Sequence, residues 1–95
     1  MSIRWLASAL ADMRGIKAYL AERNTEAAQQ VIARIRHETN LLAAQPNVGR
    51  MGRLPDTREL VIGPYPYIVA YREQHGEVQI LAVVHTSRRW PEQLV

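Results

Sequence analysis

The spacing of apolar residues predicts a helix in the first quarter of the chain. Between Leu6 and Leu20, apolar side chains recur at intervals of three and four residues and form one stripe. Residues 2–6, at its start, are rich in apolar side chains and are interpreted as a strand. Gly15 lies inside the helical stretch, where it either weakens the helix or marks a close approach of another helix. Tyr19 is expected to pack in the core or against the hairpin partner.

A second helix is predicted after a polar break at residues 24–25. Thr25 is a suitable N-cap, and Glu26 in the first turn interacts favourably with the helix dipole. Pro46 ends the element because proline cannot continue a helix. The apolar face of this helix consists of Ala28, Val31, Ile32, Ile35, Leu41 and Leu42. Two amphipathic helices joined by so short a link form an antiparallel hairpin.

The second half of the chain changes to a pattern typical of strands. Residues 46–57 form a loop rich in glycine, proline and arginine. Strand-forming residues then dominate 58–62, 67–71 and 78–84. The last of these segments has Gln as its single polar residue, which indicates a central strand buried on both faces. The order β-α-α-β-β-β predicts an α+β fold: a helical hairpin packed on a small, mostly antiparallel sheet, in a single domain over residues 1–95.

Length and composition narrow the class of protein. The chain has 95 residues, of which 47% are hydrophobic, and this suits one modest core and argues against disorder. It contains no cysteine, so disulfides, thiolate zinc sites and cysteine nucleophiles are excluded. No apolar run approaches the roughly 18 residues of a membrane helix. The first residues do not resemble a signal peptide, and we therefore expect a cytoplasmic protein with no membrane contact.

The charge of the chain is dominated by arginine. The net charge is +3, and all but one of the 12 basic residues are Arg, with Lys17 the exception. Guanidinium groups suit carboxylates and phosphates, so one interpretation is an acidic partner. The other is arginine-rich codon usage with a solvated surface. No pair of histidines or carboxylates has metal-ligand spacing, and we expect neither a metal nor a cofactor.

Five segments of the chain form a recognisable series. They are Trp5 with the helix after it, Pro46–Arg50, Arg58–Leu60, Tyr67–Arg72, and Ile80–Pro91 with the pattern V-x-H-x-x-R-x-x-P. Together they resemble the RelE/ParE superfamily of bacterial type II toxins. In this order the segments cover nearly the whole chain. The resemblance implies a toxin that is neutralised by a small antitoxin encoded beside it.

The resemblance implies one of two activities. RelE-like members cut mRNA in the ribosomal A site without a metal, and ParE-like members inhibit DNA gyrase by binding. In RelE-like enzymes an arginine stands just before the apolar part of the middle strand, where this chain has Tyr67 or Ile68. The loop before it lacks the lysines of other RNA cutters and carries Arg50 and Arg53, which cannot act as acids because arginine stays protonated. These departures favour the ParE-like branch, in which the protein itself is no enzyme.

If the protein is a nuclease, the candidate catalytic residues are His85, Arg58 and Arg88. Metal-free RNA cleavage needs a base for the 2′-hydroxyl, cations for the charged phosphorane and an acid for the leaving oxygen. Histidine titrates near neutral pH and suits the first task. The other interpretation of His85 is structural, with its ring bonded to nearby backbone in the C-terminal turn. His37 and His75 are expected to be solvated.

The residues expected to contact gyrase or antitoxin are Arg50, Arg53, Arg58, Arg72, Arg88, Arg89 and Trp90. Trp90 is also a candidate plug that folds back on the sheet, with a neighbouring arginine paired to Glu59 or Glu92. Arg58 and Glu59 are expected to form a surface pair at a strand end. The Pro66 bond in Tyr65–Tyr67 is a candidate cis peptide.

The expected partner is an antitoxin with a disordered tail that adds a strand to the open sheet edge or lays a helix in a groove. Acidic residues of the tail would meet the arginines, giving a toxin–antitoxin hetero-oligomer. The leading hypothesis is therefore a ParE-like gyrase inhibitor. The alternatives are a ribosome-dependent endonuclease and a non-toxic relative that only binds its antitoxin.

Overall fold

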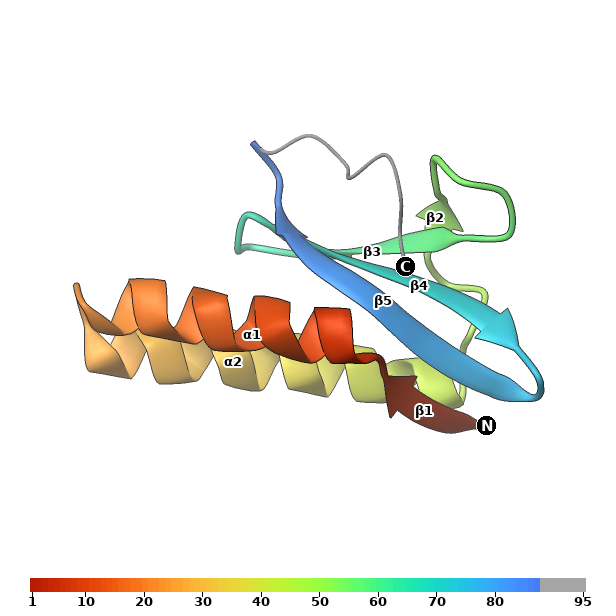
Figure 1. Ribbon diagram of the computed structural model, residues 1–95, viewed down its shortest axis with the longest axis horizontal. Coiled ribbons are helices and arrows are strands. Elements are labelled where there is room, and N and C mark those ends of the chain that lie inside the picture. Colours follow the sequence, from red (N-terminus) through yellow and green to blue (C-terminus); the bar gives the residue numbers. More distant parts are fainter. Residues whose placement is uncertain (88–95) are drawn as a thin grey trace.

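The structure is a computed structural model that describes residues 1–87, and it places a helical hairpin on one face of a five-stranded sheet (Figure 1). In chain order the elements are β1 (Ser2–Trp5), α1 (Ala7–Ala21), α2 (Thr25–Asn40), the 3-10 turn η1 (Leu41–Ala43), β2 (Arg50–Met51), β3 (Arg58–Ile62), β4 (Tyr67–Gln74) and β5 (Glu77–His85). The predicted order and the α+β class are confirmed. The addition is β2, which forms inside the segment predicted to be a loop.

The sheet has the strand order β1-β5-β4-β3-β2. Among the strands of residues 1–87, β1 and β5 run parallel and the other neighbouring pairs are antiparallel, which confirms the predicted, mostly antiparallel sheet. β5 lies between β1 and β4, and this central place explains its apolar sequence. The β4–β5 hairpin turns through His75 and Gly76, both with positive φ (55° and 74°), as a two-residue type I′ turn requires.

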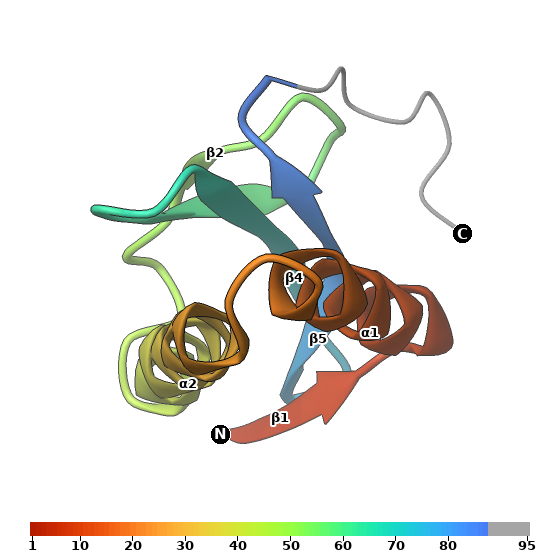
Figure 2. The ribbon, with the colours of Figure 1, turned by 90° about the vertical axis from the view of Figure 1, so that its left-hand side faces the viewer.

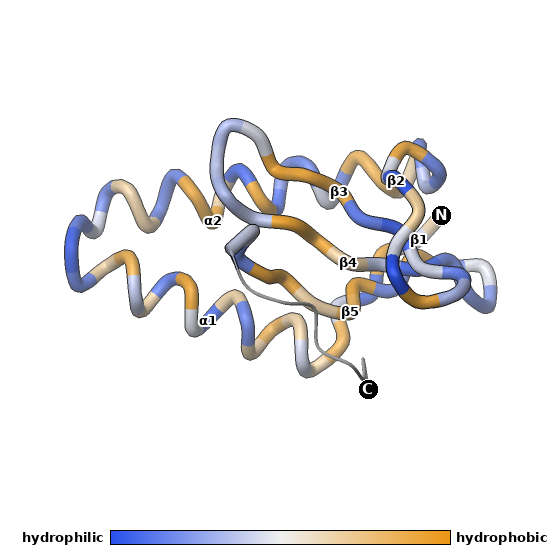
Figure 3. The backbone as a smooth tube through the Cα atoms, turned by 90° about the horizontal axis from the view of Figure 1, so that it is seen from above, coloured by the Kyte–Doolittle hydropathy of each residue, from blue (hydrophilic) through white to orange (hydrophobic). Residues whose placement is uncertain are grey.

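The main core lies between the sheet and the two helices, which run side by side beneath it (Figure 2). Side chains on the helix-facing side of the sheet meet the apolar faces of α1 and α2. The buried members are Ala9, Met13, Val31, Ile35, Leu42, Ile62, Tyr67, Val69, Tyr71, Val78, Ile80 and Val83. The apolar runs of β4 and β5 are visible in Figure 3. Full burial of one such aliphatic side chain contributes about 1.5–3 kcal/mol to the stability of the folded state.

A bulge in β5 adjusts which of its side chains face the helices. Ala70 pairs with Ala82, but Tyr71 pairs with Ile80, so Leu81 is the extra residue. Leu81, Ala70 and Ala82 form a second, smaller buried cluster with Leu6 and Val84 beside it. Because of the bulge, the consecutive residues Leu81 and Ala82 join the same cluster, whereas Ile80 and Val83 on either side belong to the main core.

The helix ends differ from the prediction in two places. Asn24, not Thr25, caps α2: its backbone is extended, and its side chain accepts a hydrogen bond from the backbone N–H of Ala27 at 3.0 Å. Leu42 is buried as predicted, whereas Leu41 is exposed because the chain leaves the α-helix for η1 at that residue. Gly15 faces open space, so it marks no close helix approach.

Two further expectations about aromatic and proline residues were wrong. Tyr19 is 55% exposed and not part of the core. Its ring is covered by the Arg23 guanidinium, 4.1 Å from the ring centroid, since residues four apart on a helix are neighbours. The cis peptide of the β3–β4 turn is Gly63–Pro64, at the tip, and not Tyr65–Pro66, which leads into β4.

Within residues 1–87, neither helix combines the length and hydrophobicity that a membrane crossing requires.

Candidate functional site

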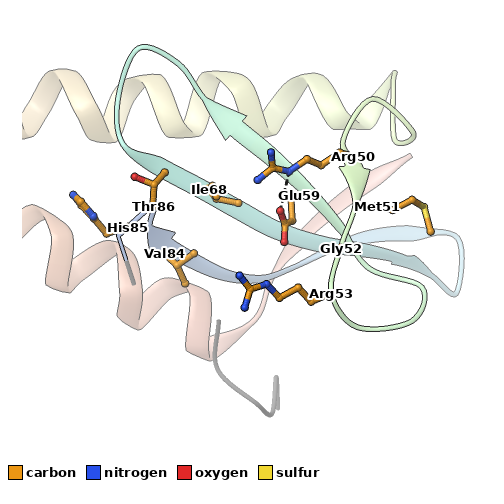
Figure 4. Close-up of a pocket in the computed structure, with 9 residues that line it drawn as sticks. All are labelled: Arg50, Met51, Gly52, Arg53, Glu59, Ile68, Val84, His85 and Thr86. Atoms are coloured by element: carbon orange, nitrogen blue, oxygen red, sulfur yellow. Dashed lines mark hydrogen bonds and ion pairs between the residues drawn. The ribbon is translucent and has the colours of Figure 1, made fainter. Parts of the chain in front are cut away.

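A polar groove of about 290 Å³ crosses the sheet face that is turned away from the helices (Figure 4). It is lined by Arg50, Met51, Gly52, Arg53, Glu59, Ile68, Val84, His85 and Thr86. The strand register brings these distant residues together. Arg50 lies opposite Glu59, and Ile68 lies opposite Val84. Residues directly opposite in neighbouring strands share a face of the sheet, so their side chains meet there.

Glu59 forms the charged centre of the groove. It is only 6% exposed, and its Oε1 accepts a hydrogen bond from Nε of Arg50 at 2.9 Å. The expected pair between Arg58 and Glu59 is therefore wrong. Consecutive residues of a strand point to opposite faces, and the two side chains cannot meet. Figure 4 shows Arg50 and Arg53 on either side of Glu59.

Arg58 lies on the other face, where it holds the segment that follows the second helix. Its guanidinium donates to the carbonyls of Asn47 at 3.2 Å and Gly49 at 2.8 Å. Tyr71 completes the arrangement: its hydroxyl donates to the carbonyl of Pro46 at 2.8 Å and accepts from Gly49 N–H at 2.9 Å. Burial raises the pKa of the Tyr71 phenol above 10.0. These contacts fix the end of the loop that positions β2 and Arg50.

Arg72 belongs to a polar row across the far end of the sheet. Its Nε donates to Oε1 of Gln79 at 2.8 Å, and the Gln79 amide donates to Glu77 at 2.9 Å. Arg4 lies 3.6 Å from the same Glu77 carboxylate. Arg72 is thus occupied within the sheet. Arg53 differs, because it has no ion pair or hydrogen bond among residues 1–87.

His85 ends β5 at the edge of the groove. Its ring packs edge-on against Tyr67, with centroids 5.4 Å apart and planes at 87°. Its Nδ1 accepts a hydrogen bond from Ser87 N–H at 3.1 Å and lies 2.7 Å from the Ser87 hydroxyl. The bond to the Ser87 backbone is the one expected for a structural histidine, and it requires Nδ1 to be unprotonated.

The candidate nuclease residues are not assembled within residues 1–87. His85 lies opposite Tyr67, whereas Arg58 lies opposite Tyr71, four residues further along β4. At about 3.3 Å per residue, this separates them by about 13 Å along the sheet. Arg88, like Arg89, Trp90 and Glu92, falls outside the described residues, so the plug and its ion pair do as well.

A second groove, of about 780 Å³, runs between α1 and the β3–β4 turn. Ile16, Tyr19 and Leu20 form its helical wall, and Tyr65 and Pro66 form the opposite one. The sequence analysis expected Tyr19 to pack in the core or against the hairpin partner and therefore missed this groove. The walls of this groove come from segments far apart in the chain, so no local pattern in the sequence marks it.

Comparison with solved structures places the fold among small α+β toxins. The structure matches a chain of the solved "Chromosomal ParDE TA system from P. aeruginosa" with a TM-score of 0.81 and 27% identity, over 92% of this chain and 97% of that one. It also matches the isolated E. coli RelE toxin with a TM-score of 0.64 over 93% and 86% of the two chains. At 13% identity, the second likeness is one of fold alone.

Sequence comparison then gives the family. The model described as "ParE toxin of type II toxin-antitoxin system, parDE" matches residues 3–90, and the chain belongs to this family. "Putative toxin Y4kP" of Sinorhizobium fredii is 42% identical over 92 residues, which is 97% of this chain and 95% of the relative. "Toxin RelE2" of Caulobacter vibrioides is 34% identical over 84 residues, which is 88% of this chain and 93% of the relative. The predicted resemblance to the RelE/ParE superfamily is confirmed.

Proposed function

We propose that this ParE-family toxin acts by binding DNA gyrase and inhibiting it, without catalysing a reaction itself. The observation that carries the proposal is the composition of the sheet groove. Its floor is apolar at Ile68 and Val84, and its buried carboxylate, Glu59, is paired with Arg50. A metal-free nuclease needs several unpaired cations around the reacting phosphate. Within residues 1–87, this groove leaves Arg53 alone unpaired, because Arg50 is bonded to Glu59.

The orientations of the other polar groups support the same proposal. The His85 ring packs on Tyr67, and its Nδ1 is occupied by Ser87. Arg58 donates both of its described hydrogen bonds to loop carbonyls. A base and a cation held in these ways are each committed to the fold, so a binding function needs fewer rearrangements than cleavage.

An antitoxin neutralises the toxin in this proposal, and both act in the cytoplasm, where gyrase is found. The groove beside α1 favours an amphipathic helix of the antitoxin as the bound element. It has a volume of about 780 Å³, and Ile16, Leu20 and Tyr65 in its walls offer apolar contacts. The complex is a toxin–antitoxin hetero-oligomer.

A supercoiling and DNA-cleavage assay with purified gyrase tests the proposal. The toxin is expected to inhibit supercoiling and to increase cleaved DNA, and added antitoxin is expected to reverse both effects. Normal gyrase activity at saturating toxin would contradict the proposal.

The second candidate function is a ribosome-dependent mRNA endonuclease, which is favoured by the relative named "Toxin RelE2". Primer extension on programmed ribosomes tests it directly. His85→Ala is the informative variant, and His75→Ala, in the exposed β4–β5 turn, is its matched control. Cleavage at A-site codons that disappears only with His85→Ala would favour the enzyme. Inactivity in both assays, with the antitoxin still bound, would indicate a non-toxic, antitoxin-binding relative.

A further inference from the structure

The arginines of the described chain are mostly engaged by the protein itself. Arg58 and Arg72 donate to internal acceptors, and Arg50 is shared with Glu59. Arg53 is exposed, lines the sheet groove and has no partner among residues 1–87. Within the described part of the chain, the arginine bias of the sequence therefore leaves one free guanidinium at this groove.

The charges of the groove favour a ligand with a single negative charge. Arg50 and Arg53 flank Glu59, so among residues 1–87 two cations and one buried carboxylate leave one positive charge of the groove uncompensated. Arg50 remains accessible to a ligand, since its side chain is 61% exposed. A guanidinium binds a carboxylate with short, charge-assisted hydrogen bonds.

An apolar subsite lies at a fixed distance from this charged one. Ile68 and Val84 are opposite each other, two residues along the strands from the row that contains Glu59. Two residues of a strand span about 6.6 Å. An extended peptide places the side chains of residues i and i+2 on one face at the same spacing.

We propose that the sheet groove binds an extended segment of the antitoxin in which an acidic residue and an aliphatic residue stand two positions apart. The carboxylate pairs with Arg53 and the free side of Arg50, and the aliphatic side chain packs on Ile68 and Val84. The inference rests on the proposed function, because the antitoxin is the partner. An RNA strand fits less well, since its successive phosphates would bring further negative charge towards Glu59 and no aliphatic side chain.

Affinity of the full toxin for the antitoxin encoded beside its gene tests the inference, with the antitoxin immobilised for biolayer interferometry. Arg53→Ala is expected to weaken binding by about tenfold or more, the loss of one charge-assisted contact. Arg34→Ala is the matched control, since Arg34 is exposed on α2, beneath the opposite face of the sheet, and has no partner among residues 1–87. It is expected to leave the dissociation constant within about twofold.

A charge swap identifies the acidic residue. Arg53→Glu is expected to abolish tight binding, and Lys at one acidic position of the antitoxin is expected to restore it. Alanine at the aliphatic residue two positions away should weaken binding by about fivefold. Thermal melts of each toxin variant establish that it is folded.

The outcomes separate this inference from the proposed function. If the antitoxin binds the Arg53→Ala and Arg34→Ala variants equally well, the groove assignment is overturned while antitoxin binding stands. If the wild-type toxin binds no antitoxin, the groove assignment and the proposed neutralisation by an antitoxin are both overturned, whereas inhibition of gyrase is decided by the supercoiling assay. A labelled single-stranded RNA provides a further test. If Arg53→Ala weakens RNA binding but leaves the affinity for the antitoxin unchanged, the peptide assignment is also overturned.

Discussion

The carboxylate of Asp12 accepts a hydrogen bond from the backbone N–H of Val83 at 2.9 Å, across 71 positions of the sequence. β1 ends opposite Ile80, so the last part of β5 has no strand on that side. One turn earlier on α1, the Ser8 hydroxyl donates to the carbonyl of Leu81 at 2.7 Å. The i, i+4 rise of a helix is about 6 Å and matches the i, i+2 rise of a strand. The helix thus covers the strand edge that β1 leaves open.

Replacement of Asp12 by Ala is expected to destabilise the fold by about 2 kcal/mol, because the partly buried Val83 N–H loses a charged acceptor. Ser8→Ala, which removes a neutral hydrogen bond, is expected to cost about 1 kcal/mol. Urea unfolding measures both values. Arg14→Ala, exposed on the same helix, is the control, and an equal loss in that variant would contradict the edge-covering role.

Tyr71→Phe is expected to destabilise the protein by about 2 kcal/mol with its secondary structure unchanged. The variant keeps the buried ring but leaves Gly49 N–H and the Pro46 carbonyl without their hydroxyl partner. Equilibrium unfolding followed by circular dichroism gives the value. Tyr19→Phe, at an exposed site, should change the free energy of unfolding by less than about 0.5 kcal/mol. Equal effects of the two substitutions would exclude a special role for the Tyr71 hydroxyl.

The stability of the wild-type protein is expected to fall more steeply at alkaline pH than that of Tyr71→Phe. Burial raises the pKa of Tyr71 in the folded state above the ordinary 10.0. The stability that the protonated Tyr71 phenol contributes to the fold is fully present below about pH 10. It is lost as pH rises through the pKa of the folded state, because the phenol of the unfolded chain ionises first. Urea titrations from about pH 8 to about pH 11 measure the difference between the two proteins. Parallel curves would contradict the buried, protonated phenol.

Two glycines are expected to respond to alanine with opposite signs. A Cβ at Gly49 would lie 2.6 Å from the Tyr71 hydroxyl oxygen and 2.9 Å from the Glu59 carbonyl, so Gly49→Ala should cost about 2 kcal/mol. A Cβ at Gly15 meets nothing within 4 Å, and Gly15→Ala should stabilise α1 by about 1 kcal/mol. The melting temperature of Gly49→Ala is expected to lie below that of the wild type, and the melting temperature of Gly15→Ala above it. A fall in both would contradict the open environment of Gly15.

Much of the fold was predictable because its signals are local. The helical spacing from Leu6 to Leu20 and the proline at residue 46 bound the hairpin, and the turn at His75 and Gly76 joins two strand-like segments. The candidate site was less predictable. From the sequence, Glu59 was expected to pair with Arg58 at a strand end. In the structure, its burial beside Arg50 makes it the centre of a groove. The expected pair with Arg58 neglected the alternation of side chains along a strand, and the sequence does not show which distant arginine reaches each face of the sheet.

By itself, the sequence determined the order of elements, the two amphipathic helices, the apolar central strand and the resemblance to a toxin family, since each depends on periodicity or local motif. The tertiary structure alone decided the two-residue strand β2, the bulge at Leu81 and the partners of the arginines. Those features depend on contacts between segments far apart in the chain. Arg50 meets Glu59, and Asp12 meets Val83, because sheet register and helix placement bring them together, and no local pattern encodes that meeting.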